Sequence, residues 1–566
     1  MTRTDYYALG AILLVVSALL LAVPAIAITG DEPRYILFAA SIWEYGALVM
    51  PAAEWVQHSS AWLGYQMDAL PALGDGAILG HPIYVTALLS PFAEFGTAGL
   101  RATGLIVGLL GLTALYVAMR HAVGLVPASI ATLCAGLLFP LVPYLHTFWA
   151  EVFIFAGIAA GLMQLPRAGE SRFSDLWRGA IILVIPFIHL RGAVIGAAIF
   201  LAFFLRVYHS AGLDFRRLAP LALLAAAFAL LLIGLNIFVY GSPIGSVTTA
   251  RPPSLFEVYD VVATNLVTVK GLLPYAPIWV LGYAGLIAGA VRRERLVVEC
   301  SAFAIVALLT SIGINPGEGA PGRFLIASVP MLAIGLAYWL SRSDNRWQWL
   351  LTSVLLVLSL VHTAVFIVRP NLHLENRQSD VVFQHIFDRI GLFNFGLSAP
   401  VEGLDTGLGR AFLLIVCLLA VLAATSIIYA RRRFAVAGFL LALGLLEMTR
   451  ASEIPVQPTI EGGVLTAALP TTPGQVSMIF GKPWERWYAP PYPLINSTTS
   501  IPGGFVEQDT RPANPIFSEA CFRGIDTMTL QSSGIDLAAA SKFRLRAFET
   551  ASVLKRSYIR FMQICD

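Results

Sequence analysis

Two acidic residues stand out for the chemistry that their surroundings allow. Asp31 and Glu32 lie in Gly30-Asp31-Glu32-Pro33-Arg34-Tyr35, directly after the first long apolar stretch. A carboxylate held there could take a proton from an acceptor hydroxyl, as a general base does. An acid followed by proline is also a good helix start, and spacing alone favours that structural role.

Glu151 is a further acidic candidate, in a second segment, His146-Thr147-Phe148-Trp149-Ala150-Glu151, at the edge of an apolar run. A carboxylate so close to an apolar helix is costly and often serves a function. The competing interpretation is a side chain that simply reaches the water interface.

Four basic residues could bind a phosphate group. His189 and Arg191 interrupt an otherwise apolar stretch, where an arginine needs an anion or a carboxylate partner. Arg323 follows a Gly/Pro-rich loop and opens a helix, so the helix N-terminus and the guanidinium would favour the same anion. Lys270, before Gly271-Leu272-Leu273-Pro274-Tyr275, is a weaker candidate of this kind.

The composition decides which elements must position these residues. Of the 566 residues, 57% are hydrophobic and 13% are charged, and the mean hydropathy is +0.75. An ordinary soluble domain has about 25% charged residues. A cytosolic globular enzyme, a disordered chain and a nucleic-acid binder are therefore excluded, and the net charge of +3 provides no basic groove. The composition predicts an all-α polytopic membrane protein.

Apolar runs predict about 13 membrane helices. The first run, Tyr6 to Gly30, is uncharged, and its length favours a retained helix over a cleaved signal peptide ending at Ala25-Ile26-Ala27. The stretch 179–206, which His189 and Arg191 interrupt, is predicted to be a hairpin of two half-depth helices. Further runs lie near 99–119, 124–143, 148–165, 218–240, 272–291, 296–313, 323–340, 347–368, 410–430 and 434–449.

The basic residues predict the orientation. With the N-terminus in the cytoplasm, 16 of the 37 Lys and Arg fall in short inside segments. An odd number of spans then puts the C-terminal region outside. The predicted domains are a transmembrane domain at 1–450, with outer loops 29–98 and 369–409, and a small mixed α/β extracytoplasmic domain at 451–566 with a helix near Ala538 to Glu549.

In order and placement, these segments resemble the GT-C superfamily of membrane glycosyltransferases, especially bacterial relatives of protein mannosyltransferases and aminoarabinose transferases. The resemblance covers residues 1–370. His81 stands where the aminoarabinose branch has lysine, so that branch is not favoured. The matching pieces are Asp31-Glu32-Pro33-Arg34-Tyr35, His81-Pro82-Ile83-Tyr84, His146 to Glu151, Asn236 to Pro243, Gly271 to Pro277 and Gly322-Arg323-Phe324-Leu325 through Pro330.

The resemblance implies an inverting transfer of a sugar from a polyprenyl-phosphate donor to a lipid, glycan or protein acceptor. The reaction would take place on the outer face of a bacterial cytoplasmic membrane, among membrane lipids and without nucleic acid. By matched position, Asp31 is the general base, and Glu151 orients the acceptor or supports a divalent metal, the only cofactor implied. The donor phosphate is bound by Arg323, Arg191, His189 and Lys270, and the first-loop substrate contacts are Glu32, Arg34 and His81.

Two other classes of function remain open. One is a transporter or lipid flippase, although no internal repeat is evident. The other is a non-catalytic assembly or sensor protein that works through its tail. One outer cavity holding Asp31, Glu151 and Arg323 would favour the enzyme, and wide separation would favour the transporter.

Overall fold

In the computed structural model the chain divides into two compact units. The helical unit comprises Met1–Leu266, Lys270–Pro370 and Ala420–Gly438, and the tail unit comprises Val267–Val269, Asn371–Leu419 and Phe439–Asp566. The structure describes residues 2–23, 32–46, 84–212, 214–243, 265–266, 271–311, 322–368, 407–448, 451–454, 458–461, 464–468, 474–480, 496–500, 506–508, 517–522, 527–533 and 543–550.

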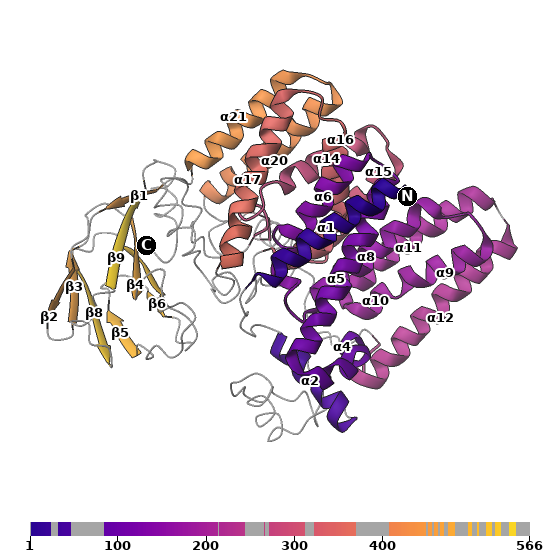
Figure 1. The fold of residues 1–566 in the computed structure, drawn as a ribbon, viewed down its shortest axis with the longest axis horizontal. Coiled ribbons are helices and arrows are strands. Elements are labelled where there is room, and N and C mark those ends of the chain that lie inside the picture. The colour runs from indigo at the N-terminus through magenta and orange to yellow at the C-terminus, as the bar shows by residue number, and fades with distance from the viewer. Residues whose placement is uncertain are drawn as a thin grey trace. The chain divides into compact units, whose positions relative to one another are not determined.

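Helices make up nearly all of the described helical unit (Figure 1), and α20 and α21 are shared between the two units. The elements are α1 (Arg3–Leu21), α2 (Glu32–Tyr45), α4 (Tyr84–Leu89), η1 (Ser90–Phe95), α5 (Gly96–Arg120), α6 (Leu125–Leu137), α7 (Leu141–Tyr144), α8 (Ala150–Gln164), η2 (Leu165–Arg167), α9 (Arg172–Leu183), α10 (Ile185–Ile188), α11 (Leu190–Ala211), α12 (Phe215–Tyr240), α14 (Trp279–Val291), α15 (Arg295–Leu309), η3 (Arg323–Ser328), α16 (Val329–Ser341), α17 (Arg346–Val368), α20 (Gly407–Ile428) and α21 (Arg432–Met448).

The helices confirm the predicted class, a mostly helical multi-pass membrane protein. Seven helices among the described residues are long and apolar enough to cross a membrane. In the most exposed of them, α12, only 6% of the apolar window is buried, as expected for a helix that faces lipid. The number of 13 spans and the orientation remain predictions.

The two ends of α5 give the helical unit a direction. Asp5, near the start of α1, accepts a hydrogen bond from Arg120 at the end of α5 (Oδ1 to Nε, 2.7 Å). Arg101 lies near the start of α5, about 28 Å away along the helix at 1.5 Å per residue. We call the end with Asp5 and Arg120 the Asp5 end, and the opposite end, with Glu32 and Arg101, the Glu32 end.

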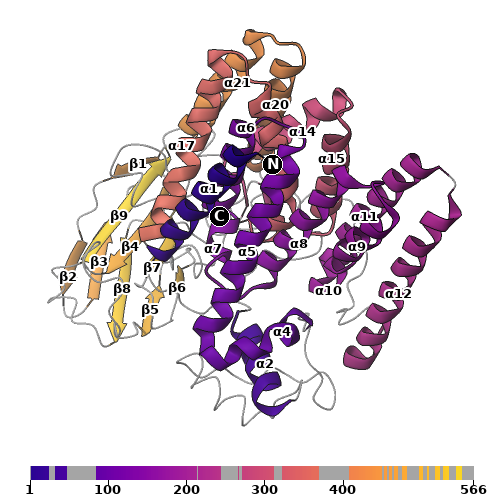
Figure 2. The same ribbon diagram turned by 45° about the vertical axis from the view of Figure 1, so that its right-hand side comes forward.

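Helices α5 and α8 lie side by side and run parallel (Figure 2). Glycines on α5 let the two helices approach closely. A Cβ on Gly104 would stand 2.7 Å from the carbonyl oxygen of Thr147, and one on Gly111 would stand 2.8 Å from Cα of Ala156. A side chain at either position would push the helices apart. The start of α8 therefore lies beside the start of α5, at the Glu32 end.

A second close approach joins α14 to α16. A Cβ on Gly285 would overlap the carbonyl oxygen of Gly335, and a Cβ on Gly335 would overlap that of Gly282. The two backbones are thus in direct contact. Because α16 continues from η3, this contact fixes the helix that carries Arg323.

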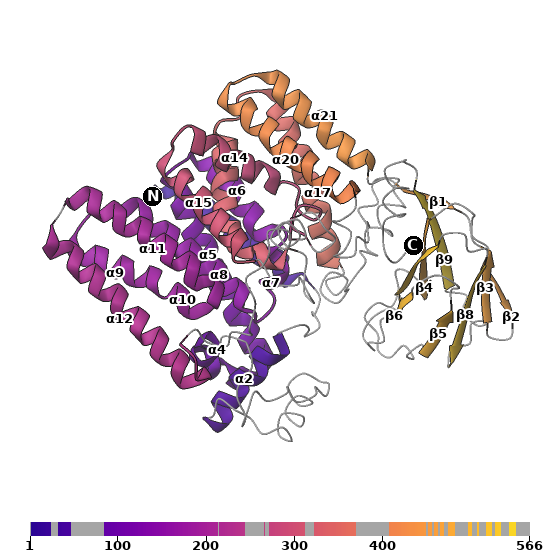
Figure 3. The ribbon, with the colours of Figure 1, turned by 180° about the vertical axis from the view of Figure 1, so that it is seen from behind.

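In the stretch 179–206 the predicted break between two helices lies at His189, but the predicted half-depth length is wrong for the second helix. Helix α9 ends at Leu183 and α10 at Ile188, His189 is extended (φ −164°, ψ 152°), and α11 then runs for 22 residues. Within it, Gly192–Ser210 alone is long and apolar enough to span a membrane. Figure 3 shows α9, α11 and α12 side by side. His189 therefore lies at the break between the helices, and Arg191 lies in the first turn of α11.

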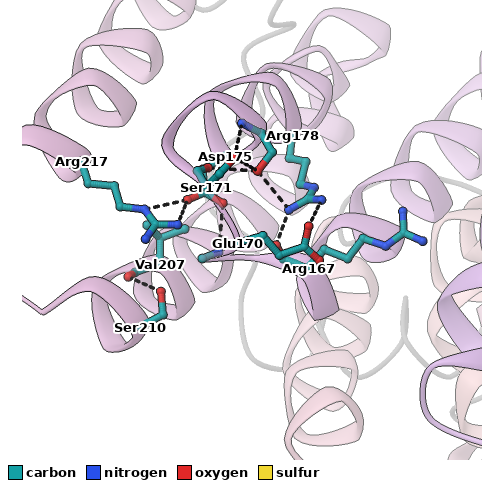
Figure 4. A network of polar contacts seen from close by, with 10 residues as sticks. Arg167, Glu170, Ser171, Asp175, Arg178, Val207, Ser210 and Arg217 are labelled. Carbon is teal, nitrogen blue, oxygen red and sulfur yellow. Dashed lines mark hydrogen bonds and ion pairs between the residues drawn. The ribbon is translucent and has the colours of Figure 1, made fainter.

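A network of hydrogen bonds between arginines and acidic residues lies at the Asp5 end (Figure 4). Arg217 of α12 donates two hydrogen bonds to Asp175 of α9 (2.7 and 3.0 Å). Arg178 donates to the carbonyl oxygen of Arg167 and to Glu170. The network ties the loop after α8 to α9 and α12. These three arginines are among those that the sequence assigns to inside loops.

The described residues of the tail beyond 450 form strands in two antiparallel sheets. The five-stranded sheet has the order β1-β9-β4-β7-β6, and the four-stranded sheet has the order β2-β3-β8-β5. The strands are β1 (Ala451–Ile454), β2 (Pro458–Glu461), β3 (Val464–Ala468), β4 (Gly474–Phe480), β5 (Asn496–Ser500), β6 (Val506–Gln508), β7 (Phe517–Phe522), β8 (Thr527–Ser533) and β9 (Phe543–Thr550).

The helix predicted near Ala538 to Glu549 is wrong over its second half. Residues Phe543–Thr550 form strand β9, which pairs with β1 and β4. Apolar Phe543, Leu545 and Ala547 alternate with two arginines, which is the period of a strand. Residues 538–542 lie outside the described residues.

Candidate active site

The Glu32 carboxylate is buried at the start of α2 and is bound from two sides. Arg101 donates to both of its oxygens, from Nε at 2.8 Å and from Nη2 at 2.6 Å. The backbone N–H of Phe148 donates to Oε1 at 2.8 Å. The Glu32 side chain is 0% exposed and that of Arg101 is 19% exposed. This bidentate, charge-assisted geometry is the strong form of such a pair. It joins the start of α2 to the chain just before α8.

Three further hydrogen bonds involve neighbouring segments at this end. Trp43 of α2 donates to Glu94 of η1 (Nε1 to Oε2, 2.7 Å). Tyr84 of α4 donates to Asn236 of α12 (2.6 Å), and the Asn236 amide donates to the carbonyl oxygen of Pro243 (3.1 Å). The contact between Tyr84 and Asn236 connects two segments that the sequence had singled out separately.

Glu151 and Arg323 form the second ion pair at this end. The Arg323 Nε donates to Glu151 Oε1 at 2.6 Å, and both side chains are buried, at 10% and 3% exposed. The Arg323 guanidinium also lies over the Trp149 ring, 4.1 Å from its centroid. A cation over an indole face is attracted by the ring quadrupole. Trp149 and Glu151 therefore fix the guanidinium from two directions.

The local backbone explains how Arg323 reaches this position. Gly322 has a φ of +72°, and a Cβ there would stand 3.0 Å from Cβ of Pro140 and 3.2 Å from Cδ1 of Leu272. The left-handed turn and the tight space both require glycine. Arg323 then opens η3 and α16, held by the glycine contact with α14.

Three polar atoms on the segment before and into α8 are buried with no hydrogen-bond partner among the described residues. They are Nε2 of His146, Nε1 of Trp149 and Oε2 of Glu151. Burial, with a smaller contribution from the Arg101 charge, lowers the pKa of His146 to about 4. His146 is therefore neutral at pH 7. Buried polar groups normally find partners, so this segment has unused hydrogen-bonding capacity.

The two buried carboxylates described at this end are each paired with an arginine. Glu32 is matched by Arg101 and Glu151 by Arg323, so each buried carboxylate has one guanidinium in contact. An unpaired buried charge would cost several kcal/mol. A ligand phosphate that bound Arg323 would share that cation with Glu151.

The structure brings together three of the residues that the sequence had selected. Glu32, through Phe148, lies against the segment that leads to Glu151, and Glu151 contacts Arg323. Arg34 is half-buried on α2, and His189 is half-buried at the reversal before α11. Asp31, His81 and Lys270 lie outside the described residues, as does the side chain of Arg191.

Two residues of this candidate site escaped the sequence reasoning. Arg101 was hidden inside the apolar run 99–119, and Trp149 belonged to a quoted segment without a role of its own. A lone arginine near the start of an apolar run was the signal that could have found Arg101, since a charge there needs a partner.

The described residues do not fit a divalent metal. No group of three or more His, Cys, Asp or Glu side chains gathers among them with metal-binding geometry. Both carboxylates at the Glu32 end face arginines, and a cation would compete with those guanidinium groups for the same oxygens. No step is therefore derived through a metal.

Comparison with known proteins gives structural likenesses only. No family model matches the chain, and neither does any curated protein sequence. ArnT from Cupriavidus metallidurans in the apo state has a TM-score of 0.40 at 15% identity, covering 77% of this chain and 74% of that one. The Archaeoglobus fulgidus oligosaccharyltransferase in the apo form has a TM-score of 0.41 at 14% identity, and covers 64% of this chain.

A further structure of the archaeal oligosaccharyltransferase AglB from Archaeoglobus fulgidus, with an inhibitory peptide and a dolichol-phosphate, has a TM-score of 0.41 at 12% identity. This chain spans 55% and 60% of the length of the two oligosaccharyltransferase chains. Scores and identities this low leave the substrate and mechanism to be argued from the residues of this chain.

Proposed function

We propose that this protein is an inverting membrane glycosyltransferase. It takes a sugar from a polyprenyl-phosphate donor and transfers it to a hydroxyl-bearing lipid, glycan or protein acceptor. The Glu32 end carries the active site and faces away from the cytoplasm, in a bacterial cytoplasmic membrane. Residues 1–450 form the catalytic membrane domain, and residues 451–566 form an extracytoplasmic domain.

The observation that supports this proposal is the meeting of three distant segments at one end of the helices. Glu32 binds the N–H of Phe148, 116 residues along the chain, and Glu151 binds Arg323, 172 residues along. Each contact joins segments that resemble motifs of one superfamily. A transporter site formed by broken helices at the membrane midplane would place its charges near the centre instead.

The chemistry follows from the charges. The leaving group is a phosphate, which is already a weak base, so the reaction needs no general acid. It needs a base on the acceptor side and cations on the phosphate side. Asp31 is the proposed base, and Glu151 orients the acceptor. Arg323, with Arg191, His189 and Lys270, stabilises the departing phosphate, and Glu32, Arg34 and His81 hold the first loop against the substrate.

The test is incubation of purified full-length protein with a panel of polyprenyl-phosphate sugars, with release of free polyprenyl phosphate as the readout. We expect release by the wild-type protein and a loss of at least about 100-fold in Asp31→Asn, because a positioned base contributes that much or more. Folding is checked by size-exclusion chromatography and by the melting temperature.

Asp214→Asn is the matched control. Asp214 caps the start of α12 through its side chain, and asparagine caps equally well. This variant should keep full activity. Full activity in Asp31→Asn would overturn the assignment of the base. Movement of labelled lipid across vesicle membranes with no release of polyprenyl phosphate would favour a flippase over the enzyme.

A further inference from the structure

Three tryptophans, Trp149, Trp279 and Trp339, are among the largest fully buried side chains, and they differ in one respect. The indole N–H of Trp279 donates to the carbonyl oxygen of Phe139 (2.7 Å), and that of Trp339 donates to the Thr352 hydroxyl (3.0 Å). The indole N–H of Trp149 has no partner among the described residues. A buried donor without an acceptor is destabilising, so this exception needs a cause.

A second unpaired atom belongs to the other residue that contacts Arg323. The Arg323 guanidinium lies over the Trp149 ring and donates from Nε to Oε1 of Glu151. The other carboxylate oxygen, Oε2, is buried and has no partner among the described residues. Glu151 is 3% exposed and Trp149 is 1% exposed. The Arg323 side chain therefore contacts two residues that each have an unpaired polar atom, the donor Nε1 of Trp149 and the acceptor Oε2 of Glu151.

A hydroxyl group is the ligand chemistry that uses both atoms. It accepts one hydrogen bond through its oxygen and donates another through its hydrogen. A phosphate oxygen would suit the indole N–H but would be repelled by the carboxylate. An ammonium group would suit the carboxylate but could accept nothing from the indole.

We propose that Trp149 Nε1 and Glu151 Oε2 together bind one hydroxyl group of the substrate, which makes Trp149 a specificity-determining residue. The inference rests on the proposed function, and it adds the recognised group and the residue that selects it. That hydroxyl belongs either to the donor sugar or to the acceptor. Both sources have the same chemistry at this pair of atoms.

The test variant is Trp149→Phe in the full-length protein, because phenylalanine keeps a ring under Arg323 and removes the N–H. Trp279→Phe is the matched control, since it loses the same ring volume and also leaves Phe139 without its donor. We expect Trp149→Phe to lower the melting temperature less than Trp279→Phe does. We also expect it to raise KM for the recognised substrate by roughly two- to tenfold, the value of one neutral hydrogen bond.

Deoxy substrates identify the source of the hydroxyl. One arm uses the polyprenyl-phosphate sugar that the wild type consumes and its monodeoxy forms, and the other uses octyl glucoside as acceptor and its monodeoxy forms. The analogue that lacks the recognised hydroxyl should raise KM of the wild type and have no further effect on Trp149→Phe. Equal KM values of wild type and Trp149→Phe for every substrate would mean that the N–H meets only water, and would overturn the inference.

Binding separates this inference from the proposed function. The stabilisation that each panel member gives is measured by thermal unfolding of the wild type and of Trp149→Phe. Ligands that stabilise the wild type more than the variant, without turnover, would leave the inference standing and refute the enzyme. Equal stabilisation, or none from any member, would refute the inference whatever the activity.

Discussion

Replacing Arg101 with methionine removes the charge on which the buried Glu32 carboxylate depends. Methionine keeps much of the apolar stem of arginine and takes away both hydrogen bonds, at 2.6 and 2.8 Å. Only the N–H of Phe148 then remains on a carboxylate that is 0% exposed. A buried ion pair broken from one side costs about 3–5 kcal/mol, because the other charge is left without compensation.

The magnitude can be separated from the loss of packing by a second change. Glu32→Gln is neutral and can still accept from Phe148, so we expect it to cost about 1 kcal/mol. The double variant Glu32→Gln/Arg101→Met contains no unpaired charge and should cost about 1–2 kcal/mol, less than Arg101→Met alone. The coupling energy of the cycle is then about 3 kcal/mol.

The assay is unfolding of the detergent-solubilised protein, followed as melting temperature and by denaturant titration. Arg342→Met is the control, because Arg342 and Glu294 form an exposed pair at 3.4 Å, worth under about 1 kcal/mol. The expected order of stability is wild type and Arg342→Met highest, then the double variant, then Arg101→Met. The reasoning would be refuted if Arg101→Met were no less stable than Arg342→Met, or if adding Glu32→Gln to it destabilised the protein further.

Three further predictions concern the same end of the helices. Gly322→Ala should lower the melting temperature more than Gly241→Ala does. Both glycines have a positive φ, which costs an alanine about 1–2 kcal/mol of strain, but only a Cβ at Gly322 meets neighbouring atoms, at 3.0 Å. Equal losses in the two variants would contradict this. Tyr84→Phe should cost about 1 kcal/mol by breaking the bond to Asn236, measured by the same assay, and no loss would contradict the contact. His146 has a folded pKa of about 4, below the ordinary 6.5, so between those values the unfolded chain binds a proton that the folded protein does not. The free energy of unfolding should therefore fall by up to about 3 kcal/mol as the pH drops from 6.5 to 4. In His146→Gln the melting temperature should depend less on pH over that range. An unchanged pH dependence in the variant would refute His146 as the origin.

The sequence predicted the class of the protein because composition alone excludes the soluble alternatives. It also selected Glu151 and Arg323, since each is a charge at an awkward place beside an apolar run. It could not predict that they contact each other, because 172 residues separate them and the contact depends on the glycine packing of α14 and α16. The prediction for 179–206 was right about a break between two helices at His189 and wrong about their depth, because the second helix, α11, is long enough to span a membrane.

The separation of the two ion pairs along the chain has a consequence for biogenesis. Glu32, Arg101 and Phe148 are all present once the first 148 residues have been made, whereas Glu151 must wait for Arg323, 172 residues later. At about 5–20 residues per second this delay is roughly 10–30 s. Lipid gives no hydrophobic drive for helices to associate, so α16 reaches α14 by close packing only after both have entered the membrane. The Glu32 pair can therefore form early in synthesis, whereas the buried Glu151 gains its compensating charge only after Arg323 has been made.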